Sequence, residues 1–193
     1  MRIIAGKYRS RAIKAAPHEK IRPTADKVKG ALFNMLGSLE GCRVVDFFAG
    51  TGNLGIEALS RGATEVVFVD RAFDSVKLIQ ENLVSLGLDT RSPREPIIRV
   101  LHMEISKAFY LLQQDHKTFD AVLADPPYEK GVARRVQNLL KTYPLLAPGG
   151  LFSIEHESKD IDFDPEFPYA LVRQKKYGDT MLSLFHHVPG GKE

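Results

Sequence analysis

The tetrapeptide Asp125-Pro126-Pro127-Tyr128 follows directly after an apolar run, Phe119 to Ala124. The run is typical of a buried strand, so Asp125 is predicted at a strand's carboxyl end, where open α/β sheets place their ligands. The prolines stiffen the loop and remove two backbone donors. The Asp125 carboxylate and the Pro126 carbonyl could accept both N–H groups of an exocyclic base amine, while Tyr128 stacks on the base. This pattern predicts an amine-methylating site, with an ordinary proline-rich turn as the alternative.

A strand, a glycine loop and a helix start are predicted between Val44 and Gly55. Gly50, Gly52 and Gly55 have the spacing of a dinucleotide-binding loop, which is weak evidence when it stands alone. Asp46 places a carboxylate where a dinucleotide would bring its anionic pyrophosphate. A cationic ligand, such as the sulfonium and amino-acid end of S-adenosylmethionine, suits this loop better.

Asp70 ends the next apolar run, 24 residues after Asp46. An acidic residue at about this distance can accept hydrogen bonds from both hydroxyls of a ribose. The alternative is a solvated carboxylate at a strand end or a helix N-cap. We therefore expect Asp70 to bind the ribose of a nucleoside cofactor.

The chain resembles bacterial 16S rRNA guanine-N2 methyltransferases of the RsmD family, from Met1 to about Phe185. The glycine motif from Asp46 to Leu59 and the tetrapeptide from Asp125 to Tyr128 occur in many amino-methyltransferases. The opening Met1 to Arg9 and the segment Arg22 to Leu36 narrow the resemblance to this family.

The resemblance implies a class I methyltransferase that uses S-adenosylmethionine and methylates the N2 amine of one guanine in small-subunit ribosomal RNA. The transfer would be direct, without a covalent enzyme intermediate. The catalytic residues would be Asp125, Pro126, Pro127 and Tyr128. The expected cofactor-binding residues are Asp46, Phe48, Ala49, Gly50, Gly52, Asp70, Arg71, Glu104 and Ile105.

Glu104 departs from the family's pattern, which often has a Gly-Asp-Ala-like turn at this point. The turn here reads Met103-Glu104-Ile105. The Glu104 carboxylate can still accept a hydrogen bond from the adenine amine. It is equally typical of a helix start, where the macrodipole favours an acidic side chain.

The composition is that of one soluble globular domain, with 193 residues, 44% of them hydrophobic and 26% charged. The only cysteine, Cys42, excludes a disulfide framework and favours the cytoplasm. No charged-then-apolar leader or apolar stretch near about 18 residues indicates export or membrane insertion. The six histidines are scattered, so no metal site is expected, and His156 is predicted to be structural.

Positive charge is concentrated at the start of the chain. Residues 1–29 contain nine Lys or Arg against two acidic residues, while the whole chain has a net charge of +3. This asymmetry favours contact with a phosphate backbone. The resemblance implies that the partner is 16S rRNA or the assembling small subunit. The alternative is a solvated sheet edge. The expected RNA-binding residues are Arg2, Lys7, Arg9, Arg11, Lys14, Arg22 and Thr24.

Alternating strands and helices predict an α/β fold with a doubly wound, mostly parallel seven-stranded sheet of the Rossmann-like class I methyltransferase type. A basic N-terminal extension over residues 1–36 precedes the methyltransferase domain of residues 37–188 and a frayed tail of residues 189–193. The extension is expected to hold a hairpin of Arg2 to Gly6 with Arg11 to Ala15, and then a helix from Ala25 to Leu36 capped by Thr24. Strands are predicted at Arg43 to Phe47, Glu65 to Val69, Ile97 to Leu101, Phe119 to Ala124, Leu151 to Glu155, Ala170 to Lys176 and Thr180 to His187. The helices between them are predicted at Asn53 to Arg61, Phe73 to Leu86, Ser106 to Gln114 and Val132 to Thr142.

Two other functions remain open at this point. An adenine-N6 or other amine methyltransferase acting on DNA or RNA could use the same tetrapeptide, although a chain this short leaves no room for a separate DNA target-recognition domain. A nucleotide-binding or RNA-binding module without catalysis would have no need for a carboxylate beside a base. The oligomeric state is expected to be monomeric.

Overall fold

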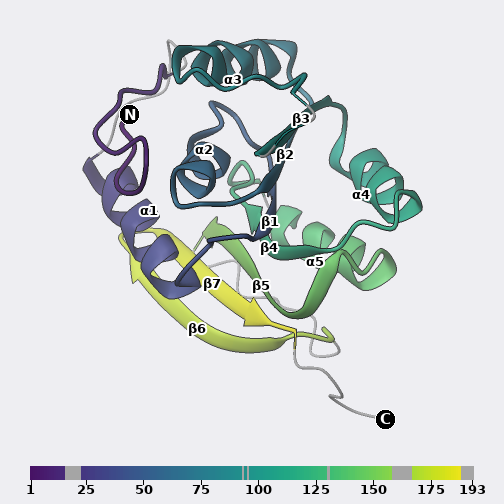
Figure 1. The fold of residues 1–193 in the computed structure, drawn as a ribbon. Coiled ribbons are helices and arrows are strands. Elements are labelled where there is room, and N and C mark those ends of the chain that lie inside the picture. The colour runs from purple at the N-terminus through teal and green to yellow at the C-terminus, as the bar shows by residue number, and fades with distance from the viewer. Residues whose placement is uncertain (16–22, 93, 95, 130, 158–166, 188–193) are drawn as a thin grey trace.

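A computed structural model of the chain describes residues 1–15, 23–92, 94, 96–129, 131–157 and 167–187, with the side chains of 23–25 left aside. Its elements are α1 (Pro23–Leu36), β1 (Arg43–Phe47), α2 (Asn53–Ser60), β2 (Glu65–Asp70), α3 (Phe73–Ser85), β3 (Ile97–His102), α4 (Ile105–Gln114), β4 (Phe119–Ala124), α5 (Val132–Thr142), β5 (Leu146–Glu157), β6 (Ala170–Tyr177) and β7 (Thr180–His186). Figure 1 shows them along the chain. Within the described ranges no helix is long and apolar enough to cross a membrane.

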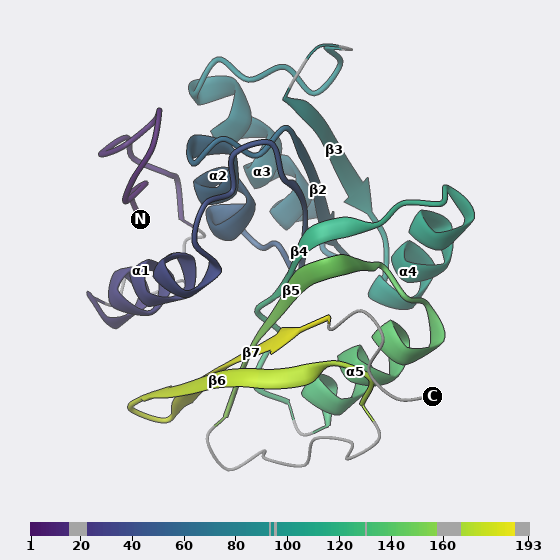
Figure 2. The same ribbon diagram turned by 60° about the horizontal axis from the view of Figure 1, so that its bottom comes forward.

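The strands form one seven-stranded sheet in the order β3-β2-β1-β4-β5-β7-β6. Strands β1 to β5 run parallel, and β7 is antiparallel to both of its neighbours, β5 and β6. The chain winds outward in one direction from β1 and in the other from β4, so the winding reverses between these two adjacent strands. Figure 2 shows the central strands and the long β6–β7 hairpin. The predicted doubly wound architecture is confirmed.

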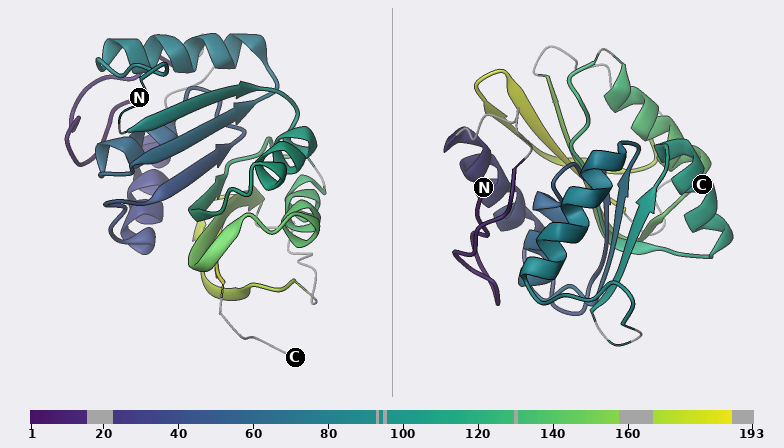
Figure 3. Two further views of the ribbon diagram at one scale, coloured as in Figure 1. Left: turned by 45° about the vertical axis from the view of Figure 1, so that its right-hand side comes forward. Right: turned by 90° about the horizontal axis from the view of Figure 1, so that it is seen from above.

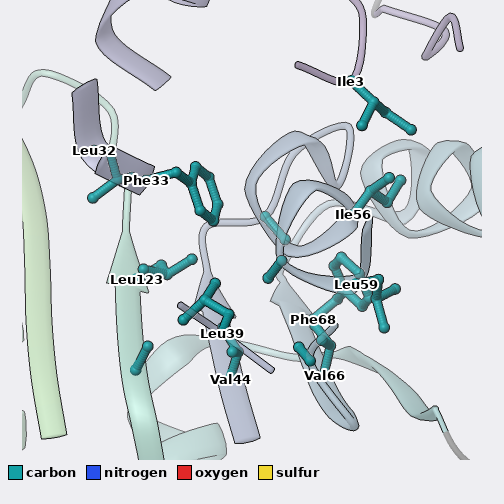
Figure 4. Packing of buried hydrophobic residues seen from close by; sticks show 14 of the residues in the cluster. Ile3, Leu32, Phe33, Leu39, Val44, Ile56, Leu59, Val66, Phe68 and Leu123 are labelled. Atoms are coloured by element: carbon teal, nitrogen blue, oxygen red, sulfur yellow. The ribbon is translucent and has the colours of Figure 1, made fainter. Parts of the chain in front are cut away.

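Helices cover both faces of the sheet (Figure 3). On one face α1, α2 and α3 share an apolar core with Ile3 and Ile13 of the N-terminal segment, and Figure 4 shows part of this packing. On the other face α4 and α5 pack over the sheet, with Phe47 stacked on Phe109 at a centroid distance of 4.4 Å. Gly55 lets α2 approach the sheet closely, because a Cβ at this position would lie 2.2 Å from the Phe68 ring. The glycine motif therefore fixes helix packing as well as loop shape.

The predicted N-terminal hairpin is wrong in its extent, since only one isolated antiparallel bridge forms, between Arg2 and Ala12. The amides that a longer ladder would use are bound elsewhere: Ile4 and Ala5 donate to the Glu57 carboxylate at 2.8 and 3.1 Å. The Glu57 side chain and the Ser60 carbonyl at the end of α2, which accepts the Lys7 amide at 2.7 Å, thus take the place of a second strand. The N-terminal segment therefore packs along α2 and does not form a separate β-hairpin.

Other element boundaries differ by small amounts from the predictions. Helix α1 begins at Pro23, so Thr24 lies inside its first turn instead of preceding it as a cap. Strand β5 begins at Leu146, five residues earlier than predicted, because an irregular stretch with Gly149 at φ 78° still pairs with β4. Arg22 and the predicted tail of residues 189–193 lie outside the described residues.

Candidate active site

The two predicted motifs meet where the winding of the sheet reverses. The β1–β4 register pairs Phe47 with Ala124, so Phe48 and Asp125 leave neighbouring strands at the same level. Asp125 lines three cavities, with volumes of about 540, 260 and 220 Å³. A crevice at this place is where open α/β sheets bind ligands. Asp125 is therefore positioned to act between ligands held in adjoining cavities.

The smallest of the three cavities is formed by the glycine loop. Phe48, Gly50 and Gly52 all have positive φ angles, of 60°, 53° and 79°. A positive φ is uncommon for an aromatic residue and costs on the order of 1–3 kcal/mol. The Ala49 amide holds the strained loop in place by donating to the Val69 carbonyl at 3.0 Å.

Asp46 lines this cavity and is almost completely buried, at 1% exposure. Its Oδ2 accepts the Gly55 amide at 2.8 Å, at the start of α2. Burial raises the pKa of Asp46 to about 7, the Gly55 hydrogen bond opposes that rise, and the nearby Asp70 adds to it. A buried carboxylate with this pKa is stabilised in its ionised form by a cationic ligand.

Asp70 stands at the carboxyl end of β2, beside the middle cavity. Its two oxygens accept the amides of Gly50 and Ala72, each at 2.8 Å. These bonds fix the carboxylate relative to the glycine loop, and each oxygen keeps a further lone pair. Phe48 and Ile105 provide apolar surface in the same cavity.

Glu104 caps the start of helix α4, which was the alternative to its predicted contact with adenine. It is the N-cap of α4, its Oε2 accepts the Ser106 amide at 2.8 Å, and its Oε1 accepts Arg135 at 2.6 Å. Partial burial acts to raise its pKa, but the bonds from Ser106 and Arg135 hold the pKa of Glu104 below its usual value. Glu104, Ile105 and Arg71 all line the middle cavity, so the predicted adenine contact remains a prediction.

Tyr128 lines the largest of the three cavities, and its hydroxyl group is hydrogen-bonded to residues of two strands. Its hydroxyl donates to Glu155 Oε1 at 2.5 Å and lies 2.7 Å from Thr180 Oγ1. Burial, followed by the hydrogen bond to Glu155, raises the pKa of Tyr128. The residue stays half exposed, at 48%, so part of it is open to a ligand.

Sequence reasoning missed Glu155 as a site residue. It lies on β5, where the register pairs Ala124 with Ile154 and so brings Glu155 level with Asp125. Burial raises the pKa of Glu155, against the opposing hydrogen bond from Tyr128. A strand-end glutamate was visible in the sequence, but the order of the strands was needed to place it beside the tetrapeptide.

His156, the next residue, has the predicted structural role. It is buried, with Nδ1 at 2.9 Å from the Glu157 carbonyl and Nε2 at 2.8 Å from Ser183 Oγ. Among the residues that the structure describes, no three His, Cys, Asp or Glu side chains are grouped to hold a metal ion.

Glu57 and Lys29 form a buried ion pair that sequence reasoning also missed. Lys29 Nζ lies 3.5 Å from Glu57 Oε2, with side-chain exposures of 2% and 0%. Lys29 also donates to the Arg2 carbonyl at 2.7 Å and to Asn53 Oδ1 at 2.6 Å. Burial lowers the pKa of Lys29, and Glu57 opposes that shift. Since Asn53 lines two of the cavities, this pair connects the N-terminal segment to the site.

The predicted RNA-binding residues divide into those with protein partners and those without. Arg2 pairs with Asp26 at 3.4 Å, and Lys14 pairs with Glu81 at 3.0 Å. The Arg11 guanidinium donates to the Ser85 carbonyl. In the described part of the chain, exposed Lys7 and Arg9 have no ion pair, although Lys7 lies over the Tyr8 ring at 5.4 Å. The structure brings none of these side chains into the lining of the three cavities.

Comparison with known proteins relates this arrangement to methyltransferases. The family model described as "Conserved hypothetical protein 95" matches residues 1–186. Ribosomal RNA small subunit methyltransferase D of Escherichia coli K12 is 33% identical, over 100% of this chain and 92% of that protein. The solved structure of yhhF from Escherichia coli has a TM-score of 0.81 at 29% identity, covering 97% of this chain and 98% of that one.

A more distant structure shares the fold. The 16S rRNA N2 methyltransferase RsmC of Thermus thermophilus, solved with AdoMet and guanosine, has a TM-score of 0.66 at 23% identity. The match covers 88% of this chain and 44% of that one.

Proposed function

This chain belongs to the family described as Conserved hypothetical protein 95, and we propose that it transfers a methyl group from S-adenosylmethionine to the N2 amine of a guanine in small-subunit (16S) ribosomal RNA. The relative named ribosomal RNA small subunit methyltransferase D supports the reaction and the RNA. The observation that carries the proposal is the position of Asp125. It lines the two smaller cavities, which Phe48 also lines, and the cavity of about 540 Å³ that Tyr128 lines.

The cofactor side of the site suits S-adenosylmethionine in charge and shape. Buried Asp46 favours a cation, the fixed Asp70 carboxylate can accept ribose hydroxyls, and the apolar wall that includes Phe48 suits a purine ring. When bound, S-adenosylmethionine supplies a methyl group on a positively charged sulfur that an aligned amine can accept directly. The residues of this chain then mainly position that amine, which can account for up to about 7–11 kcal/mol of acceleration.

The substrate side is built to hold an amine at Asp125. The lone pair of a guanine N2 amine is delocalised into the ring, and acceptors for its two hydrogens favour a more nucleophilic nitrogen. The Asp125 carboxylate and the Pro126 carbonyl are the proposed acceptors. The Tyr128 ring would stack on the base after it leaves its stack in the RNA, a step that costs a few kcal/mol.

Asp46 predicts how cofactor binding depends on pH. The pKa of Asp46 in the folded protein, about 7, is above its ordinary value of 3.8. The protonated side chain therefore stabilises the cofactor-free fold fully below pH 3.8, and this contribution is lost as the pH rises through about 7. A cationic cofactor selects the ionised form. We expect affinity to rise by up to about tenfold per pH unit between about pH 5 and 7 and then to level off.

Calorimetry with S-adenosylmethionine across this pH range, in buffers of different ionisation enthalpy, measures both the affinity and the proton released. Asp46→Asn is the matched control, and its affinity should not follow pH in this range. A wild-type affinity that does not change with pH would contradict the role of Asp46.

The exposed basic residues of the N-terminal segment predict salt-dependent RNA binding. Neutralising Lys7 and Arg9 together should weaken binding to all RNA sequences and flatten the slope of log affinity against log salt by about 0.7–0.9 per lost phosphate contact. Cofactor affinity should stay the same. The affinity of 16S rRNA measured at several salt concentrations tests this. An unchanged slope would move the RNA-binding surface away from this segment.

The proposed function is tested by mass-spectrometric mapping of 16S rRNA from a strain that lacks this gene. One guanine should lose an N2 methyl group and regain it when the gene is restored. Loss of a methyl group from an adenine, or no change in the 16S rRNA, would reject the assignment.

We further propose that the enzyme acts as a monomer in the cytoplasm, on naked 16S rRNA or on the assembling subunit.

A further inference from the structure

The cavity of about 540 Å³ on the proposed substrate side includes four acidic side chains in its lining. Asp125, Glu155, Glu157 and Asp179 all line it. Lys29 also lines this cavity, but its ammonium group is already paired with buried Glu57. Tyr177, whose hydroxyl has no hydrogen-bond partner among the described residues, adds one donor to the lining. Four carboxylates still leave acceptors in excess of donors, and this excess matters for the choice of base.

Guanine and adenine differ in what they present next to the reactive amine. Guanine has two adjacent donors, N1–H and the N2 amine, whereas the ring nitrogen beside the amine of adenine is an acceptor. A flipped base is read through hydrogen bonds on this edge. Two acceptors side by side fit guanine, because an adenine ring nitrogen would face a carboxylate without a proton between them.

Asp125 can provide one of these two acceptors, and Glu155 lies where it can provide the other. The β4–β5 register brings it level with Asp125 on the adjacent strand, and neighbouring strands lie about 5 Å apart. Phe152 and Ile154 pack into the core under α4 and α5, so alternation along β5 turns Glu155 and Glu157 to the opposite side, where the cavity lies.

One oxygen of Glu155 is already committed. Oε1 accepts the Tyr128 hydroxyl, and among the described residues Oε2 has no hydrogen-bond donor. The Tyr128 bond fixes the orientation of the carboxylate and of the ring at the same time. A base stacked on Tyr128 would therefore meet a carboxylate in a defined position.

We propose that Glu155 is the residue that selects guanine, by accepting the N1–H of the base while Asp125 accepts hydrogen from its N2 amine. This inference rests on the proposed function and assigns the choice of base to a side chain outside the Asp-Pro-Pro-Tyr motif. Glu155 would form and break no covalent bond with the base. In the transfer the N2–methyl bond would form as the sulfur–methyl bond breaks, the sulfur would leave as an uncharged thioether, and the surplus N2 proton would pass to the hydrogen-bonded Asp125 carboxylate.

The test replaces the target guanine with 2-aminopurine, which keeps the reactive N2 amine but has an acceptor at N1. The substrate is a 16S rRNA fragment that contains the mapped guanine, prepared with either base and presented free and reconstituted into small subunits. Single-turnover methylation is compared between wild type and Glu155→Gln. In the variant the amide oxygen can keep the Tyr128 bond, and the NH₂ group then faces the base as a donor.

Wild type should methylate guanine more efficiently than 2-aminopurine, and Glu155→Gln should reduce this preference by about 10- to 100-fold, as expected for a hydrogen bond to a charged group. Comparing the two ratios removes the intrinsic difference in reactivity between the bases. Asp120→Asn, at the end of β4 away from the cavity, is the control and should keep the wild-type ratio.

Equal loss of activity on both bases in Glu155→Gln would overturn the inference. The role of Glu155 would then be limited to its hydrogen bond with Tyr128. A wild-type enzyme that does not discriminate between the bases would also overturn it, while the proposed function stands. Failure of wild type to methylate the guanine substrate in either form would instead reject the proposed function together with the inference.

Discussion

Replacing Asp125 with alanine is expected to lower methyl transfer by roughly 10²- to 10⁴-fold, the range typical for removal of a group that acts on the reacting atoms. Cofactor affinity should stay within a few-fold of wild type, because the proposed cofactor contacts of Asp46 and Asp70 come from strands β1 and β2 and do not depend on the Asp125 carboxylate. Single-turnover rates and calorimetry on the same preparation separate the two effects.

Asp120 offers a matched control at the opposite end of β4. It accepts the Arg43 amide at 2.7 Å, and Asp120→Asn keeps an oxygen for that bond. This variant should transfer methyl groups at the wild-type rate. If Asp125→Ala lost cofactor affinity and rate by the same factor, Asp125 would belong to the cofactor pocket instead of the reacting amine.

The second large effect is expected on stability. Glu57→Ala removes the acceptor of the Ile4 and Ala5 amides and leaves Lys29 as a buried cation without its carboxylate. Breaking a buried pair in this way costs about 3–5 kcal/mol. Urea denaturation at neutral pH measures the change in the free energy of unfolding.

Two further variants show whether this loss comes from the buried pair. Glu81→Ala breaks the exposed ion pair that also ties the N-terminal segment to the domain, and it should leave stability within experimental error. The double variant Lys29→Met/Glu57→Leu should be less destabilised than the sum of the two single changes. Equal stability of Glu57→Ala and Glu81→Ala would contradict the role of Glu57 as the anchor of this segment.

The strands and helices of the catalytic domain were predictable because each has a clear pattern. Buried parallel strands such as Phe119–Ala124 are mostly apolar, and helix α2 begins at Asn53, directly after the glycine loop. The tetrapeptide and glycine loop could be placed at one edge of the sheet from strand ends alone. These positions depend on local sequence and on the general rules of parallel sheets.

The missed features all depend on contacts between distant segments. The N-terminal hairpin was predicted from alternation, but the Glu57 carboxylate and Ser60, more than 50 residues away, take the amides of this segment. Lys29 was counted among the nine basic residues of positions 1–29, yet it is 2% exposed and pairs with Glu57. Glu155 gained its position from the order β4-β5-β7, which no local pattern encodes.

The most direct test of the account supplies S-adenosylmethionine with a deuterated methyl group to the purified protein and to 16S rRNA or small subunits from the strain that lacks the gene. The RNA is digested to nucleosides and analysed by mass spectrometry. The account predicts the label on N2 of guanosine with wild-type protein, and its near-complete loss with Asp125→Ala. Label on the N6 amine of adenosine, or no labelled nucleoside from either substrate, would contradict it.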